Sequence, residues 1–150
     1  MPSSTTIPPR VPELQSRRGI LDTSVVIDLE RLVAEDLPAE LAISAITLAE
    51  LAAGPHATSD PDERARRQDR IQRAEATFEP LPVDASVARA YGRIYAAVTG
   101  AGRKARGARS LDLLIAATAL ASNLPLYTRN PDDFAGIASL VEIVAIPAAR

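Results

Sequence analysis

The sequence of 150 residues contains no cysteine, no tryptophan and a single histidine, His56. Without cysteine there can be no disulfide framework, zinc–thiolate centre, iron–sulfur cluster or cysteine nucleophile. One histidine cannot form a multi-histidine metal site. If the protein binds a metal, carboxylates and other oxygens must hold it, and these are the ligands of hard cations such as Mg²⁺ or Mn²⁺.

Long apolar runs are missing as well. The best candidate, residues 113–128, is interrupted by Asn123 and Pro125, so we expect no membrane span. Residues 1–18 are polar, contain four prolines and lack the apolar centre of a secretory signal, which predicts a flexible leader and a cytoplasmic protein. The remainder, residues 19–150, has the length of one domain, and the composition, 47% hydrophobic and 24% charged, is typical of a globular protein.

From residue 19 onward, short apolar runs alternate with longer helical segments. Such alternation is typical of βαβ units that build a parallel sheet, so we expect an α/β fold. The predicted strands cover residues 19–21, 41–45, 78–83, 126–128 and 141–146. The predicted helices cover residues 47–53, 61–77, 85–98 and 111–122, and a first helix, which Thr23 or Ser24 can cap, directs Leu29 inward. We expect the helix over 61–77 to face solvent or a partner, because it is polar nearly all round and offers little to a core.

Four acidic residues lie inside or beside apolar runs: Asp22, Glu50, Asp112 and Asp133. Each one has a purely structural explanation. Asp22 can cap the helix that follows it, and Glu50 can form a capping box with Thr47. Asp112 suits the positive end of its helix, and Asp133 suits a turn. Taken one at a time, these residues do not decide between a structural and a functional role.

The coincidence of the four acids favours a site. In a parallel sheet, the ends of the strands and the starts of the following helices lie along one edge, and all four acids occupy such positions. Carboxylates gathered there would repel one another and raise their pKa values unless a divalent cation neutralised them. A metal in such a cluster can activate water and polarise a phosphate without a nucleophilic side chain. The pattern therefore predicts metal-assisted hydrolysis of a phosphodiester.

Four short motifs carry a family resemblance through their order and spacing: Ile20–Ser24, Ile46–Leu51, Leu111–Ala117 and Thr128–Phe134. With these motifs the chain resembles the PIN-domain ribonucleases, and within that family the VapC-type toxins of bacterial toxin–antitoxin pairs. The resemblance implies a three-layer α/β/α fold with a small parallel sheet. It also implies an acidic pocket that binds Mg²⁺ or Mn²⁺ and cleaves RNA, with transfer RNA as one candidate substrate.

The resemblance assigns roles to the four acids by their positions in the motifs. Asp22 and Asp112 would be the main metal ligands, and Glu50 and Asp133 would complete the pocket, some of them through water. All four are therefore expected to be catalytic as well as metal-binding residues.

The same motifs contain neutral polar residues that would assist the acids. The hydroxyls of Ser24 or Thr23, and of Thr128, would help to position the metal or the phosphate. Many PIN domains have an acid at the position of Asn130, two residues after Thr128. In this chain Asn130 would be a neutral ligand or a phosphate contact, and Asp133 would be the fourth acid.

Partners are implied in the same way: a homodimer, and a cognate VapB-type antitoxin that covers or enters the active-site groove. The formal net charge of −2 neither requires nor excludes nucleic acid, but cations gather in segments 64–73 and 103–109. Arg106 and Arg109 of the second segment shortly precede Asp112, so they can flank the pocket and bind RNA phosphates. An exposed, solvated loop is the alternative.

The alternative function is a catalytically inactive PIN-like module that binds RNA or protein, in which the acids merely cap helices. The two functions respond differently to mutation. A binding module keeps its biological effect after Asp22→Asn or Asp112→Asn, whereas a nuclease loses it.

Overall fold

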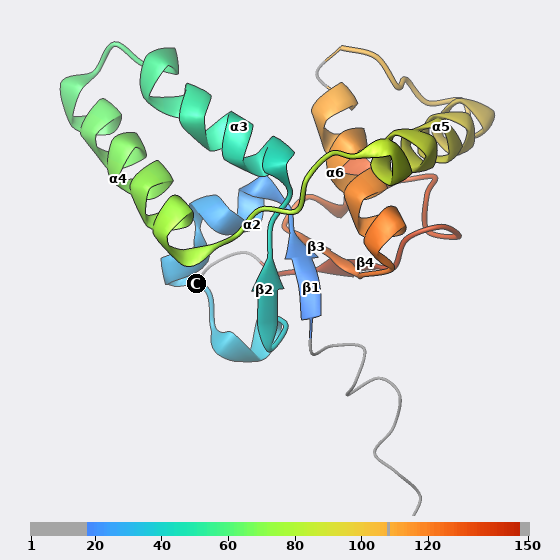
Figure 1. Ribbon diagram of the computed structural model, residues 1–150, viewed down its shortest axis with the longest axis horizontal. Helices are drawn as coiled ribbons and strands as arrows, with labels where there is room; N and C mark the ends of the chain where they lie inside the picture. Colours follow the sequence, from blue (N-terminus) through green and yellow to red (C-terminus); the bar gives the residue numbers. More distant parts are fainter. Residues whose placement is uncertain (1–17, 108, 148–150) are drawn as a thin grey trace, which may run out of the picture.

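A four-stranded, wholly parallel sheet lies at the centre of the molecule (Figure 1). The computed structural model describes residues 18–107 and 109–147. The strands are β1 (Arg18–Leu21), β2 (Glu40–Ala42), β3 (Leu126–Thr128) and β4 (Ile143–Ala145), and their order across the sheet is β2-β1-β3-β4. The four strand positions confirm the parallel α/β sheet that the sequence predicted.

Helices cover both faces of this sheet. The α-helices are α2 (Thr23–Ile27), α3 (Ala45–Ala53), α4 (Pro61–Thr77), α5 (Ala85–Gly100) and α6 (Arg109–Ser122). Short 3-10 helices are η1 (Leu29–Arg31), η2 (Ala34–Asp36), η3 (Gly54–Ala57) and η4 (Pro131–Phe134). Figure 1 shows α3 and α4 on the left of the strands and α5 and α6 on the right.

Side chains of the strands pack in two separate hydrophobic cores, because neighbouring residues of a strand point to opposite faces of the sheet. Ile20 and Leu126 pack in one core with side chains of α5 and α6. Leu21 and Tyr127, the next residues of the same strands, pack in the other core with side chains of α2, α3 and α4. This division confirms the predicted three-layer α/β/α arrangement.

Side-chain caps fix where the helices begin. Asp22, Ser44, Asp60 and Asp84 are the N-caps of α2, α3, α4 and α5, and each accepts a hydrogen bond from a backbone N–H of the first turn. Helix α6 ends before Asn123, whose φ of 54° lies in the left-handed region that stops a helix. The carboxyl ends of the strands therefore lead directly into helix starts at one edge of the sheet.

The capping box predicted for α3 is wrong. Ser44 is the N-cap, and its Oγ accepts the N–H of Ile46 at 3.0 Å, so the helix starts two residues earlier than expected. Thr47 consequently lies inside the helix and is not its N-cap. Glu50 therefore cannot form a capping box with Thr47. The start of α2 is capped by Asp22, and not by either hydroxyl residue that follows it.

Residues 78–83 do not form the predicted strand. Leu81 makes only an isolated parallel bridge to Ser44. Pro80 and Pro82 lack the N–H groups that a strand within a sheet needs. The expectation that the helix over 61–77 offers little to a core was also wrong, because two residues of α4, Ile71 and Ala74, are buried in the second core.

The leader predicted over residues 1–18 lies, apart from its last residue, outside the described residues. The domain boundary at residue 19 stays a prediction for the same reason. Within the described ranges, no helix combines the length and the apolar character that crossing a membrane requires.

Candidate functional site

The carboxylate of Asp22 is buried directly beyond the end of β1, and only 4% of the residue is exposed. Its Oδ1 accepts the N–H of Thr23 at 2.9 Å, and its Oδ2 accepts the hydroxyls of Ser24 at 2.9 Å and Thr128 at 2.8 Å. Burial raises the pKa of Asp22, the three hydrogen bonds oppose that effect, and the charge of Asp133 adds to it. The fold therefore fixes the orientation of a carboxylate that is costly to ionise.

The two hydroxyls that bind Asp22 are themselves held by the backbone that follows β3. The N–H of Asn130 donates to Thr128 Oγ1 at 2.9 Å, and the N–H of Arg129 donates to Ser24 Oγ at 3.3 Å. Because each hydroxyl accepts a backbone N–H, its single proton is directed toward Asp22. The side chain of Asn130 is exposed and makes no hydrogen bond to another described residue.

Helix α3 brings Glu50 to the same edge. The hydroxyl of Thr23 donates to Glu50 Oε1 at 2.6 Å and lies 3.0 Å from the hydroxyl of Thr47. Thr23 has one hydroxyl proton, which Glu50 receives, so Thr47 must be the donor in the second contact. Glu50 is thus bound to Thr23, the residue next to Asp22, and this contact explains the position of Glu50 better than a capping role does.

Asp112 lies in the first turn of α6 and is partly buried. Burial and then the charges of Asp22, Asp133 and Glu50 raise the pKa of Asp112 from 3.8 to about 6, while the charge of Arg109 lowers it. Within the described residues, no hydrogen-bond donor reaches its carboxylate. Asp112 is therefore the acid of this group with the strongest electrostatic demand for a cation.

Asp133 differs from the other three acids because it has a cationic partner. Its Oδ1 accepts Arg109 Nη1 at 2.9 Å, and the same nitrogen donates to the backbone carbonyl of Asp133 at 3.1 Å. Asp133 nevertheless acts on both Asp22 and Asp112 through its charge. The structure thus brings the four predicted acids to one region, with Asp133 at its basic side.

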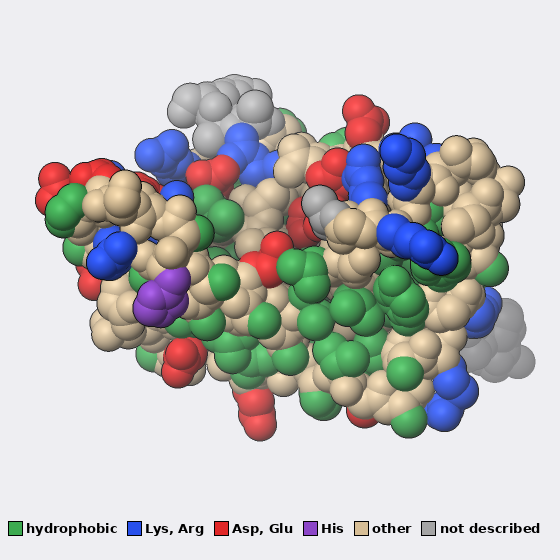
Figure 2. Space-filling model, turned by 90° about the horizontal axis from the view of Figure 1, so that it is seen from above, with side chains coloured by type: hydrophobic (Ala, Val, Ile, Leu, Met, Phe, Trp, Pro, Cys, Tyr) green, Lys and Arg blue, Asp and Glu red, His purple; other side chains and the backbone are tan. Residues whose placement is uncertain are grey.

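Figure 2 looks onto this edge of the sheet and shows acidic side chains in a hollow near the middle of the face, with Lys and Arg side chains to the right of it. Four cations line a cavity of about 310 Å³, three from the segment before α6 and one from its first residue: Arg103, Lys104, Arg106 and Arg109. They are held in place by neighbours: Arg103 donates to the carbonyl of Asp132 at 3.1 Å, and Arg106 donates to the Tyr95 hydroxyl at 3.3 Å. A basic cavity therefore borders the acidic hollow.

The donor set fits a hard cation. No three acidic or histidine side chains within the described ranges are close enough to enclose one ion. An ion at this position would therefore keep water among its ligands, which is the usual state of protein-bound Mg²⁺ on one or two carboxylates. The oriented carboxylate of Asp22 and the carboxylate of Asp112, which Arg109 neutralises only in part, are the groups that would hold such an ion.

Sequence reasoning missed one ion pair beside the site. The guanidinium of Arg129, which follows β3, binds the carboxylate of Asp28 at the end of α2. The pair joins α2 to the segment that carries Thr128 and Asn130. Its two members are 101 residues apart in the chain, so no local pattern could have indicated the contact.

Known proteins resemble this chain in sequence and in fold. The family model of the PIN domain matches residues 20–140. Two similar proteins of Mycobacterium tuberculosis are Ribonuclease VapC5, 40% identical over 133 residues, and Ribonuclease VapC8, 39% identical over 102 residues. These matches cover 85% of this chain and 95% of VapC5, and 67% of this chain and 89% of VapC8.

A solved structure agrees with these relatives. The crystal structure of VapBC-5 from Mycobacterium tuberculosis, a member of the VapBC family of toxin–antitoxin systems, matches with a TM-score of 0.75 and 36% identity. The match covers 88% of this chain and 99% of that chain. The present chain belongs to the PIN-domain family and, within it, to the VapC ribonucleases.

Proposed function

We propose that this protein is a divalent-metal-dependent endoribonuclease and the toxin of a two-component toxin–antitoxin pair. Ribonucleases of the VapC kind generally depend on a divalent metal. The observation that carries the proposal is the gathering of acids at this edge of the sheet: the buried Asp22 is oriented by three hydrogen bonds, and Asp112, in the first turn of α6, is near enough to Asp22, Asp133 and Glu50 for their charges to raise its pKa. A doubly charged cation would remove that repulsion.

Asp22 and Asp112 are the proposed main ligands of Mg²⁺ or Mn²⁺. Glu50 would contribute through water, and Asp133 would supply the fourth negative charge. When bound, the metal would supply the Lewis-acid chemistry that activates water and polarises the scissile phosphate. The chain itself presents a carboxylate, that of Asp22, which three hydrogen bonds have already oriented, so little reorganisation accompanies binding.

The proposed RNA-binding residues lie on both sides of the acids. Arg106 and Arg109 would bind phosphates of the RNA backbone, because they line the basic cavity beside the hollow. Ser24 and Thr128 act on the acidic side by fixing Asp22. The exposed amide of Asn130 is available for a phosphate contact. Transfer RNA is one candidate substrate, and we propose that the protein works in the cytoplasm.

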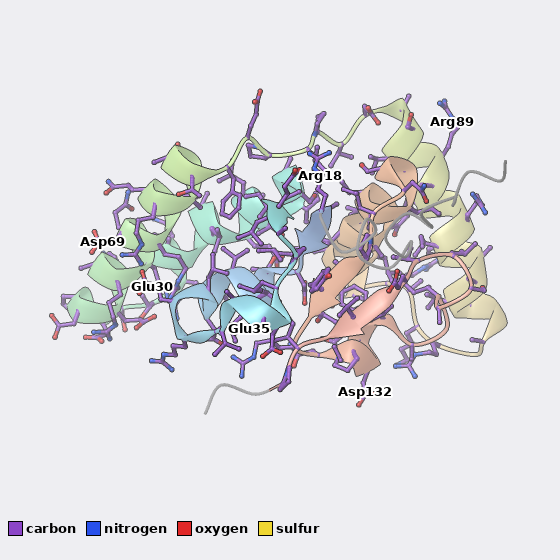
Figure 3. All side chains as sticks on the ribbon, turned by 90° about the horizontal axis from the view of Figure 1, so that it is seen from below. Arg18, Glu30, Glu35, Asp69, Arg89 and Asp132 are labelled. Carbon is purple, nitrogen blue, oxygen red and sulfur yellow. The ribbon has the colours of Figure 1, made fainter. Side chains whose placement is uncertain are left out.

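Cleavage of RNA by the purified chain, free of antitoxin, tests the proposal. We expect cleavage with Mg²⁺ or Mn²⁺, loss of cleavage in EDTA, and recovery when the metal is restored. Asp112→Asn should cut at least about a hundredfold more slowly, because a ligand is lost from the centre that stabilises the transition state. Glu35→Gln, an acid-to-amide change at an exposed acid of η2 labelled in Figure 3, is the control and should leave the rate unchanged.

Two outcomes would contradict a nuclease of this kind. Cleavage that persists in EDTA would exclude the metal mechanism. RNA binding without cleavage, unchanged by Asp112→Asn, would instead support the alternative, a catalytically inactive module that binds RNA or protein.

We further propose that a VapB-type antitoxin binds the chain and that the chain forms homodimers. A groove of about 530 Å³ runs between the segment 26–31 and α4. Apolar side chains, among them the 44%-exposed Ile27, meet charged side chains of both elements there, including Glu30 and Asp69, both labelled in Figure 3. Exposed apolar side chains next to charged ones are the kind of surface that a protein partner can cover. Ile27→Asp should weaken antitoxin binding, measured by calorimetry, while RNA cleavage by the free chain persists. Light scattering of the free chain reports its oligomeric state.

A further inference from the structure

Asp133 and Arg109 form an ion pair at the boundary between the acidic hollow and the basic cavity. Arg109 Nη1 donates to the carboxylate of Asp133 at 2.9 Å and to its carbonyl at 3.1 Å. Side-chain exposures of 34% for Arg109 and 39% for Asp133 show that both groups still face solvent. The pair therefore combines a fixed position with access for a ligand.

The position of Asp133 is fixed by the core. The next residue, Phe134, is 1% exposed and belongs to the first core. The N–H of Asp133 donates to the carbonyl of Asn130 at 3.0 Å, which closes the turn of η4. Arg103 also binds this turn, through the carbonyl of Asp132. Two arginines of the basic segment thus bind one rigid turn.

Arg109 is equally close to the acids. It precedes Asp112 by three residues on α6, a spacing that places both side chains on one face of a helix. Its charge lowers the pKa of Asp112, in opposition to the three acids. A guanidinium has five N–H donors, and the pair with Asp133 uses one nitrogen, Nη1, which leaves the others for another acceptor.

We propose that Asp133 is a positioning residue and not a metal ligand: it holds the guanidinium of Arg109 where that group binds an RNA phosphate beside the scissile one. The inference rests on the proposed nuclease function and revises the role of its fourth acid. The charge of Asp133 is already balanced by Arg109, so a metal gains less from it than from Asp112. The ligand chemistry is a polyanion, because four cations line the adjoining cavity.

Binding of Mn²⁺ to the intact chain, measured by calorimetry, separates a ligand from a positioning residue. We expect Asp133→Asn to bind Mn²⁺ within about twofold of the unmodified chain, and Asp112→Asn to bind at least about tenfold more weakly. Asp132→Asn is the matched control, because its side chain lies at the edge of the molecule and points outward (Figure 3). If Asp133→Asn weakens Mn²⁺ binding as much as Asp112→Asn does, the inference is wrong. If Asp112→Asn binds normally, the proposed metal site fails first, and the inference fails with it.

A double-mutant cycle on RNA cleavage tests the route of action. Arg109→Gln should raise KM for RNA, and adding Asp133→Asn to it should change the cleavage rate by less than about twofold, because Asp133 acts through Arg109. If Asp133 and Arg109 acted independently, the losses in cleavage caused by the two single substitutions would multiply in the double variant. That result would overturn the inference. Arg109→Lys keeps the charge without the planar fork and should recover part of the loss in KM. Circular dichroism of each variant confirms that the fold is kept.

Discussion

Replacing Asp112 by asparagine should make the metal-free protein more stable, at the expense of function. The folded chain raises the pKa of Asp112 from 3.8 to about 6, so ionising it is harder in the folded than in the unfolded state. Two pKa units correspond to about 3 kcal/mol. Asp112 is only partly buried, and solvent screens its interactions with the other acids, so we expect a gain of about 1 kcal/mol. For a chain of this length, such a gain raises the melting temperature by about 2–4 °C.

The pH dependence of this gain has a definite sign. Well below pH 3.8, Asp112 is protonated in both the folded and the unfolded state, and its ionisation costs nothing. As the pH rises from about 4 to 6, the unfolded state releases its proton first, and the folded state progressively loses stability. The wild type is therefore less stable than Asp112→Asn at pH 7.5, and the difference shrinks as the pH falls and disappears at about pH 3.

Urea denaturation in EDTA at both pH values measures this difference. Excess Mg²⁺ should then stabilise the wild type but not the variant, because only the wild type has the complete site. At a concentration a hundredfold above the dissociation constant, binding adds about 2.7 kcal/mol. An Asp112→Asn variant that is less stable than the wild type at pH 7.5 in EDTA would refute the electrostatic reasoning.

Three substitutions test the supports of the site and of the fold. Thr128→Val removes a fully buried hydroxyl that donates to Asp22. We expect the free energy of unfolding, measured in urea, to fall by about 1.5–3 kcal/mol and the cleavage rate to fall at least about tenfold. Unchanged cleavage would contradict the orienting role of Thr128. Gly19→Ala would place a Cβ 2.5 Å from Cε1 of the Tyr127 ring, so denaturation should show a loss of about 1–3 kcal/mol. Gly92→Ala, exposed on α5 with nothing within 4 Å of its Cβ, should instead gain about 0.5–1 kcal/mol. Equal effects of the two glycine changes would contradict the packing described around β1.

Much of the fold could be predicted from local sequence patterns. The helix over 61–77 is bounded by Asp60 and by the end of its polar run, and its observed limits match the prediction. The start of α3 was misjudged because Ser44 and Thr47 are both suitable caps. In the fold, Ser44 caps the helix and also forms a bridge to Leu81, a contact between distant parts of the chain. Local propensity alone does not contain that information.

The candidate site could likewise be predicted only in part. Its acids could be assigned to one edge of a parallel sheet, because that edge follows from topology. The hydrogen bonds that distinguish their roles could not be assigned. Thr128 and Asp22 are 106 residues apart, and Arg109 and Asp133 are 24 residues apart. Only the packed fold shows that Asp22 receives three donors and that Asp133 receives an arginine.

The central claim is that acids distant in the chain jointly hold one divalent cation. Anomalous diffraction from crystals soaked in Mn²⁺ tests it most directly, because the ion is seen at its ligands without reference to activity. We predict a peak in contact with the carboxylates of Asp22 and Asp112, and none in crystals of Asp112→Asn. A fully soaked crystal without a peak between these two residues would contradict the claim.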